Sequence, residues 1–383
     1  MNILFAVLTS LAALVPSGAF PTSPLYSEPR NVSHALFDSL EELARIVDIA
    51  YCVGSSGIQK PFRCLSRCDD FEGFDLVSTW HTGPLLSDSC GYIALSHPPH
   101  PKRIIVAFRG TYSIANTVAD LSTIPAEYVP FPAEGGGGDD VCATANGDNN
   151  LFKVQQVEPA DTARGPKCEN CTVHLGFMTS WKNTRCVVIP HIEKALAAFP
   201  DYQVTLVGHS LGGAVAALAS LEFQARGWEP QVTTFGEPRV GNQALNSYID
   251  ERFNWSKQDS SKNTYRRVTH VSDPVPLLPL EEWGYRAHAG EIFISKYDLP
   301  PTVVDLQHCD GDEDPECIAG RRALEIDSNM GIKERDTWHI PERYKLWELF
   351  FAHRDYFWRL GLCVPQQGGR WPPVQSPVAA EEL

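Results

Sequence analysis

The sequence lacks an apolar run of the roughly 18 residues that a membrane-spanning helix requires. Its longest candidate, Ile3–Val15, is shorter and lies at the N-terminus. Positive charge is also scarce, because 32 Lys and Arg stand against 47 Asp and Glu, a formal net charge of -15. Nucleic acids and anionic membranes repel such a chain. We therefore expect no nucleic-acid partner and no stable membrane anchor, and a neutral substrate fits best.

The N-terminal run predicts a secretory signal peptide rather than a buried strand. It is followed by the small residues Ser17, Gly18 and Ala19, which suit cleavage before Phe20. No Lys or Arg precedes the run, so only the terminal amino group supplies positive charge there. We expect residues 1–19 to be removed and the mature protein to be secreted into the extracellular space.

The composition indicates a globular protein, because 43% of the 383 residues are hydrophobic and 21% are charged. This length allows two domains, but α/β folds of this size often form one. We expect one domain over residues 20–363, with a Gly-, Asp- and Asn-rich loop insertion at about 132–166. Residues 364–383 are rich in Pro, Gln and Glu and predict a disordered tail.

Short apolar, β-branched runs alternate with helical stretches along the chain, which predicts an α/β fold with a central, mostly parallel sheet flanked by helices. The strands are expected at Ile104–Phe108, Val204–Val207, Val232–Phe235 and Val268–Val271. Apolar residues at three- and four-residue spacing predict one helix at Ser39–Cys52, and another is expected at Ala214–Ala225.

Ser210 is the candidate nucleophile. It lies in a G-x-S-x-G pattern, Gly208–Gly212, between a predicted strand and an Ala-rich predicted helix. Such a turn strains the backbone of the central serine, and the glycines remove side chains that would collide there. The pattern predicts the α/β-hydrolase fold, in which an acid and then a histidine follow the serine along the chain.

Asp273 is the preferred acid, because it follows a predicted strand and precedes prolines that force a loop. Asp250 and Asp259 lie in helical or polar surroundings and are weaker candidates.

Four histidines follow Asp273 and could supply the base: His288, His308, His339 and His353. His353 follows a helical stretch near the end of the predicted domain, as a base in the last loop should, but the residues alone leave the choice open. His209 should point away from the nucleophile and serve packing.

Patterns that suggest metals or cofactors are incomplete. The glycines at 135–138 lack the Lys-Ser/Thr that follows a phosphate-binding loop. The acidic residues of Asp310–Glu316 lack the glycine and the twelve-residue spacing of an EF-hand, so we expect a solvated acidic loop. Cys168 and Cys171 have the spacing of a redox or metal pair, but a plain disulfide is preferred. We expect neither a cofactor nor a metal.

The cysteines and the glycosylation motifs agree with secretion. Eleven cysteines favour disulfides in an oxidising compartment. Asn31, Asn170 and Asn254 each begin an Asn-x-Ser/Thr triplet and are candidate glycosylation sites, although such triplets also arise by chance.

Six motifs, in order along the chain, resemble those of the fungal class 3 triacylglycerol lipases, the group that contains Rhizomucor-type lipases and feruloyl esterases. The resemblance runs from about Phe37 to Cys363. The motifs are Ala107–Thr111, Val173–Phe177, Gly208–Gly213, Phe235–Asn242, Asp273–Pro276 and His353–Phe357.

The resemblance implies a catalytic triad of Ser210, Asp273 and His353, and so chooses among the histidines. It also implies that Thr111 and Leu211 form the oxyanion hole. Donors placed where a carbonyl oxygen becomes negative are worth a hundredfold or more in rate.

Related lipases carry an amphipathic lid just after the oxyanion residue, and Ser113–Val118 occupies that place, with Ile114, Ala115 and Val118 as its expected apolar face. Thr117 stands where many of these lipases have tryptophan, which weakens the expectation of a lid that opens at an oil–water interface.

The cysteine spacing is similar to that of extracellular yeast lipases. This similarity implies the disulfides Cys52–Cys363, Cys64–Cys68, Cys168–Cys171 and Cys309–Cys317. It leaves Cys90, Cys142 and Cys186 unassigned.

We therefore expect a secreted serine esterase that cleaves acylglycerols, as a triacylglycerol lipase does, through an acyl-enzyme intermediate. A feruloyl or other small-ester esterase and a phospholipase remain alternatives. A non-catalytic secreted binding protein is a distant one, since a fold alone does not prove chemistry. The sequence does not indicate an oligomeric state.

Overall fold

The computed structural model describes residues 30–83, 89–111, 125–130, 167–256, 262–320 and 351–365. Several predicted features lie outside these ranges: the signal peptide, the loop insertion, and residues 366–383 of the tail. The lid candidates Ile114 and Val118 also lie outside them, as do Cys142, Asp259 and His339. No helix within the described ranges is long and apolar enough to cross a membrane.

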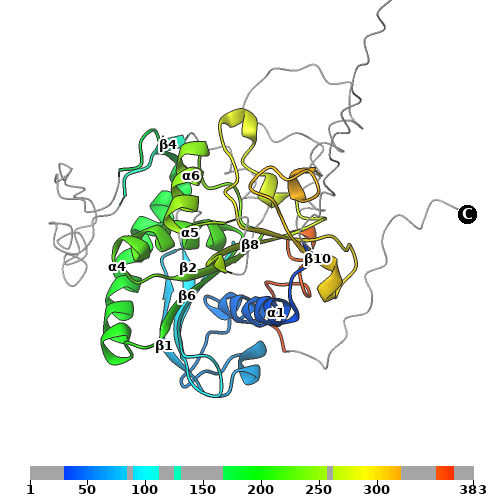
Figure 1. Ribbon diagram of the computed structural model, residues 1–383. Helices are drawn as coiled ribbons and strands as arrows, with labels where there is room; N and C mark the ends of the chain where they lie inside the picture. The colour runs from blue at the N-terminus through cyan, green and yellow to red at the C-terminus, as the bar shows by residue number, and fades with distance from the viewer. Residues whose placement is uncertain are drawn as a thin grey trace, which may run out of the picture. The chain divides into compact units, whose positions relative to one another are not determined.

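An eight-stranded sheet forms the centre of the fold, in the order β1-β2-β3-β6-β7-β8-β9-β10 (Figure 1). The five strands from β3 to β9 run parallel, whereas β1, β2 and β10 pair antiparallel at the edges. The expected mostly parallel sheet is therefore confirmed. The strands are β1 Phe74–His81, β2 Cys90–Ser96, β3 Arg103–Arg109, β6 Gln203–His209, β7 Gln231–Phe235, β8 Tyr265–His270, β9 Glu291–Ile294 and β10 Leu306–His308.

Helices cover both faces of the sheet, as continuous apolar strands require. Successive side chains of a strand point to opposite faces. Ile104 and Val106 of β3 accordingly pack in one core with α4 and α5, whereas Ile105 of β3 packs in a second core with α1. Figure 1 shows α1 on one side of the sheet and α4 and α5 on the other. The α-helices among the described residues are α1 His34–Ile49, α4 Leu175–Ala198, α5 Leu211–Ala225 and α6 Gln243–Arg252.

Shorter elements complete the described fold. A two-stranded sheet consists of β4 Pro125–Glu127 and β5 Thr172–His174. The 3-10 helices are η1 Ala50–Cys52, η2 Arg67–Asp70, η4 Val275–Leu277, η5 Glu281–Trp283 and η6 Val303–Asp305.

The first helix differs from its predicted bounds. It begins at His34 instead of Ser39, because the Ser33 side chain accepts a hydrogen bond from the Leu36 amide and caps the helix there. Its last turn also tightens into the 3-10 helix η1, which ends at Cys52. The helical region thus spans the predicted one but starts five residues earlier.

Candidate active site

The candidate nucleophile lies between β6, which ends at His209, and α5, which begins at Leu211. Ser210 has φ 59° and ψ -132°, a conformation that is strained for a residue with a side chain. The turn is also tightly packed, because a Cβ on Gly208 would lie 2.3 Å from the Gly212 carbonyl oxygen. The glycines of the motif are therefore required sterically, as predicted.

Strand ends bring the candidate residues to one edge of the sheet. Ser210 follows β6, Asp273 follows β8 after two residues, and Thr111 follows β3 after one. The carboxyl ends of parallel strands meet at one edge, where α/β folds build their sites. The Ser210 amide also donates to the Phe235 carbonyl of β7 at 2.9 Å, which ties the serine to the neighbouring strand.

Asp273 and His353 form a buried pair. His353 Nδ1 lies 2.9 Å and 3.0 Å from the two carboxylate oxygens of Asp273, and both residues are almost completely buried. A carboxylate in this position accepts a hydrogen bond from the Nδ1–H group and fixes the imidazole tautomer. His353 Nε2 is then the ring nitrogen that can accept a proton from another group.

Tyr356 is a further hydrogen-bond partner of the Asp273 carboxylate. Its hydroxyl donates to Asp273 Oδ2, and the Val275 amide donates to Asp273 Oδ1 at 2.9 Å. Burial and the nearby Asp273 carboxylate raise the pKa of Tyr356 well above its usual value, so the phenol stays protonated as a donor. Asp273 thus receives hydrogen bonds from three described groups, which orient it. Sequence reasoning missed this role of Tyr356.

His209 supports the base in a way that packing alone does not describe. Its ring stacks on that of His353, with centroids 4.7 Å apart, and its Nε2 lies 2.9 Å from the His353 carbonyl oxygen. A carbonyl only accepts, so Nε2 carries the proton and Nδ1 accepts from the Tyr51 hydroxyl. Burial and the neighbouring His353 and Arg354 lower the pKa of His209 well below its usual value, which keeps the ring neutral.

Three polar atoms of the candidate site have no hydrogen-bond partner within the described part of the chain. They are Ser210 Oγ, His353 Nε2 and Thr111 Oγ1, and all three are buried. Buried polar atoms without partners are costly and uncommon in native folds. These three atoms belong to the candidate nucleophile, the candidate base and the candidate oxyanion residue, and unpaired polar atoms there suit a site that binds a substrate.

Two glycines allow the backbone to approach these groups closely. A Cβ on Gly110 would lie 2.8 Å from Ser210 Cβ, so the turn before Thr111 lies directly beside the nucleophile. A Cβ on Gly236 would lie 2.8 Å from both His353 Cε1 and Asp273 Oδ2. The turns that follow β3 and β7 therefore lie close to the serine and to the acid–base pair respectively.

The other candidates belong to structural contacts. His288 is buried beside Glu237, with Nε2 3.0 Å from Glu237 Oε1. Asp250 accepts from the Ala289 amide at 3.0 Å. His308 is the last residue of β10. Burial lowers the pKa of His308, and the nearby positive charge of Arg266 lowers it further. None of these contacts includes Ser210.

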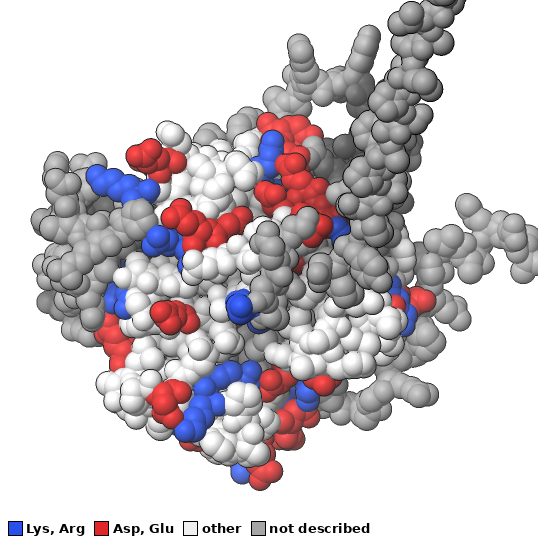
Figure 2. Space-filling model, in the orientation of Figure 1, with Lys and Arg blue, Asp and Glu red and all other residues white. Residues whose placement is uncertain are grey.

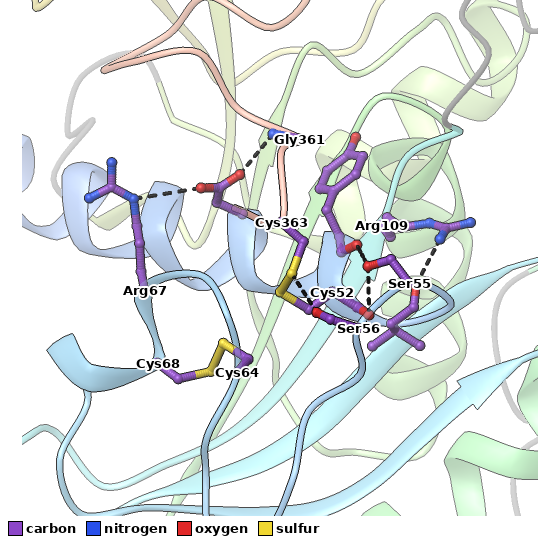
Figure 3. Close-up of a disulfide and its surroundings, with 12 residues drawn as sticks. Cys52, Ser55, Ser56, Cys64, Arg67, Cys68, Arg109, Gly361 and Cys363 are labelled. Carbon is purple, nitrogen blue, oxygen red and sulfur yellow. Dashed lines mark hydrogen bonds and ion pairs between the residues drawn. A yellow bond between two sulfur atoms is a disulfide. The ribbon is translucent and has the colours of Figure 1, made fainter. Parts of the chain in front are cut away.

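The four disulfides implied by the resemblance occur in the structure. They are Cys52–Cys363, Cys64–Cys68, Cys168–Cys171 and Cys309–Cys317. Cys186 is also disulfide-bonded, and Cys90 is buried on β2. Figure 3 shows Cys52–Cys363 joining the end of η1 to the segment that follows His353.

The remaining features are the glycosylation motifs, the acidic loop and the charged surface. Asn31, Asn170 and Asn254 are exposed, so glycosylation there stays a prediction. The acidic loop is not fully solvated as expected, because Asp314 is buried and accepts hydrogen bonds from the Asp310 and Glu316 amides. On the face drawn in Figure 2, basic side chains are interspersed with groups of acidic ones.

Comparisons with known proteins agree with the predicted family. The sequence model of the family described as Lipase (class 3) matches residues 105–283. The chain is 48% identical to the secreted mono- and diacylglycerol lipase 2 of Gibberella zeae, over 90% of this chain and 86% of that protein. It is also 48% identical to lipase A of Sodiomyces alcalophilus, over 96% of this chain and 92% of that protein.

A solved structure has the same fold. The crystal structure of the Lip2 lipase from Yarrowia lipolytica aligns with a TM-score of 0.68 and 27% identity, covering 88% of this chain and 98% of that one. The expected α/β-hydrolase architecture is therefore confirmed.

Proposed function

The chain belongs to the class 3 lipase family, whose members are carboxylic ester hydrolases, and from this premise we propose that it is a secreted serine hydrolase of acylglycerols. Ser210, Asp273 and His353 act as its triad, and Thr111 and Leu211 form its oxyanion hole. The observation that carries the proposal is the buried Asp273–His353 pair. Neither His353 Nε2 nor Ser210 Oγ has a hydrogen-bond partner among the described residues.

The reaction proceeds in two steps. Ser210 Oγ attacks the ester carbonyl while His353 Nε2 accepts its proton, and the negative oxygen of the tetrahedral intermediate is held by the Thr111 and Leu211 amides. The alcohol leaves with the proton from His353, and the acyl group stays on Ser210. Water then attacks the acyl-enzyme, again with His353 as base, and the carboxylic acid is released.

Two relatives guide the substrate class. The Gibberella zeae protein is named as a secreted mono- and diacylglycerol lipase, and so is a Penicillium cyclopium relative that is 31% identical over 59% of this chain. We therefore propose partial glycerides as substrates beside triacylglycerols. The net charge of -15 also suits an uncharged substrate better than an anionic phospholipid.

Two single variants test the proposal: Ser210→Ala, and Ser220→Ala as its control. Ser220 is a buried serine of α5, the helix that follows Ser210, and its hydroxyl donates to the Ala217 carbonyl. Ser220→Ala therefore tests the effect of removing a nearby buried serine hydroxyl. Ser210→Ala should abolish hydrolysis of monoolein, diolein and triolein and prevent labelling by a fluorophosphonate probe. Ser220→Ala should retain both. Turnover by a folded Ser210→Ala variant would exclude the assignment.

A further inference from the structure

Arg109, the last residue of β3, contacts the backbone on two sides. Its Nη1 lies 2.7 Å from the Val53 carbonyl oxygen, and its Nε lies 3.2 Å from the Gly110 carbonyl oxygen. Both acceptors are carbonyls, so both contacts are hydrogen bonds that the guanidinium donates. The side chain therefore connects the end of β3 to the loop that follows η1.

The contact with Gly110 fixes the direction of the next amide. The Gly110 carbonyl and the Thr111 N–H belong to one planar trans peptide and point in opposite directions. When Arg109 holds the carbonyl on one side, the N–H must face the other side. A rotated peptide would direct a carbonyl oxygen where the N–H now points.

That peptide lies beside the nucleophile. A Cβ on Gly110 would lie 2.8 Å from Ser210 Cβ and 2.9 Å from the His209 carbonyl oxygen. The Tyr51 hydroxyl would lie 2.5 Å from the same Cβ. A rotation of this peptide would thus take place close beside the reacting serine.

The other acceptor of Arg109 is itself held in place. Val53 follows Cys52, which is joined to Cys363 by a disulfide. Gly54 has φ +81°, and a Cβ on it would lie 3.1 Å from Arg109 Nη1. Figure 3 shows Arg109 directed at this loop, close to the residues of the disulfide. The guanidinium therefore spans from a crosslinked loop to the peptide beside Ser210.

We propose that Arg109 is a positioning residue that orients the Gly110–Thr111 peptide, so that the Thr111 amide faces the developing oxyanion. The proposal rests on the proposed function and adds a residue to it. Arg109 does not contact substrate in this role. It acts through the peptide that it holds, so its loss should lower transition-state stabilisation and leave ground-state binding nearly unchanged.

Two substitutions separate orientation from charge. In Arg109→Lys the position of Nε becomes a methylene, so the bond to Gly110 is lost while a positive charge that can reach Val53 is kept. Arg109→Gln removes the charge as well. Arg103→Gln is the matched control. Arg103 is the first residue of β3, at the end of the strand away from Arg109, and its guanidinium pairs with Glu42.

The concentration of active sites in each variant is first determined by titration with a fluorophosphonate until labelling is complete. The value of kcat then refers to folded enzyme only. On a soluble p-nitrophenyl ester we expect kcat to fall by about 10- to 100-fold in both Arg109 variants, with KM within about twofold, since one oxyanion donor is worth about 100-fold or more. The Ki of an alkylboronic acid, which forms a tetrahedral adduct on serine, should rise by the same factor. Arg103→Gln should change neither kcat nor Ki.

The outcomes are distinguishable. If Arg109→Lys or both variants keep the wild-type kcat per titrated site and the wild-type Ki, the positioning role is wrong and the proposed function stands. If the wild-type protein is neither titrated nor active, the proposed function fails first. A fall in kcat with an unchanged boronate Ki would also contradict the role, because the tetrahedral adduct would not depend on Arg109.

Discussion

The Asp273 carboxylate is oriented by Tyr356, a residue 83 positions away in sequence. Replacing Tyr356 with Phe removes a buried hydrogen bond to a charged group, which we expect to cost about 1.5–3 kcal/mol of unfolding free energy. The activity should fall severalfold, because Asp273 then holds His353 less firmly. Urea denaturation and kcat on a soluble ester measure the two effects.

Tyr92→Phe is the control for this substitution. Its hydroxyl is also buried but donates to the neutral Ile46 carbonyl, at 2.8 Å. We expect a smaller loss of about 1 kcal/mol and an unchanged kcat. Equal effects of the two substitutions on kcat would show that Tyr356 does not act through Asp273.

A second residue-scale prediction concerns Asp48, a buried carboxyl that accepts the Gly361 amide at 2.7 Å. Burial raises the pKa of Asp48 from 3.8 to about 6, although the Gly361 hydrogen bond and Arg67 lower it in part. The folded protein then binds more protons than the unfolded chain between these values. Stability should therefore fall as the pH rises from about 4 to about 7, by up to about 3 kcal/mol from this group.

Asp48→Asn keeps an oxygen acceptor for Gly361 and removes the titration. The free energy of unfolding of this variant should improve relative to wild type as the pH rises over that range. Asp38→Asn changes an exposed carboxylate on the same helix and serves as the control for replacing an aspartate there. Urea denaturation at several pH values tests both, and parallel profiles for Asp48→Asn and wild type would refute the assignment.

Local signals in the sequence pointed to two of the three residues of the proposed triad. Ser210 has a strand, a tight glycine turn and a helix around it, and Asp273 follows a strand and precedes prolines, so each is recognisable from its neighbours. His353 has no such local pattern, and only the family resemblance selected it. The contacts of Tyr356 and His209 arise from tertiary packing between distant segments, which periodicity does not report.

At the scale of elements, the segment that carries His353 is joined to the start of the fold. The Cys52–Cys363 disulfide spans 311 residues, whereas Cys64–Cys68 spans 4. A crosslink restricts the unfolded chain more when it closes a longer loop. Replacing both cysteines of the long-range pair with serine should therefore cost about 5 kcal/mol, against about 2 kcal/mol for the short-range pair.

The activities of the two double-serine variants should also differ. Loss of Cys52–Cys363 frees the chain ten residues after His353 and should lower kcat at a temperature where the variant is folded. Loss of Cys64–Cys68 should leave kcat unchanged. Thermal unfolding and titrated kcat measure both effects, and equal destabilisation by the two changes would contradict the loop-length argument.

The four strands at the centre of the sheet were predictable, and the strands on either side of them were not. The four predicted strands overlap β3, β6, β7 and β8, although β8 begins three residues before the predicted Val268 and ends at His270 instead of Val271. Most residues of these strands are buried, as expected for strands covered on both faces. Strand β1 alternates buried and exposed residues, but the half-buried Val77 and Ser78 interrupt this pattern, and β9 has only four residues. Short or interrupted patterns are weak signals, and such segments depend more on pairing with a neighbouring strand.

At the scale of the whole molecule, the net charge of -15 should govern which lipid surfaces the protein reaches. An anionic interface repels it, and salt screens that repulsion as the Debye length shrinks from about 30 Å at 0.01 M to about 8 Å at 0.15 M. Raising NaCl over this range should therefore increase the initial rate on diolein emulsions that contain an anionic phospholipid. The rate on purely neutral diolein emulsions should change little.

A soluble p-nitrophenyl ester is the control for direct effects of salt on the catalytic step, because its hydrolysis requires no interface. Its kcat should stay constant over the same salt range. Adsorption to the two emulsions, measured by depletion of protein from the aqueous phase, should follow the rates.

Since the repulsion comes from the summed charge and not from one side chain, single Glu→Gln changes at exposed positions should each reduce the salt response only slightly. An equal salt response on neutral and anionic emulsions would show that the net charge does not control access to the substrate.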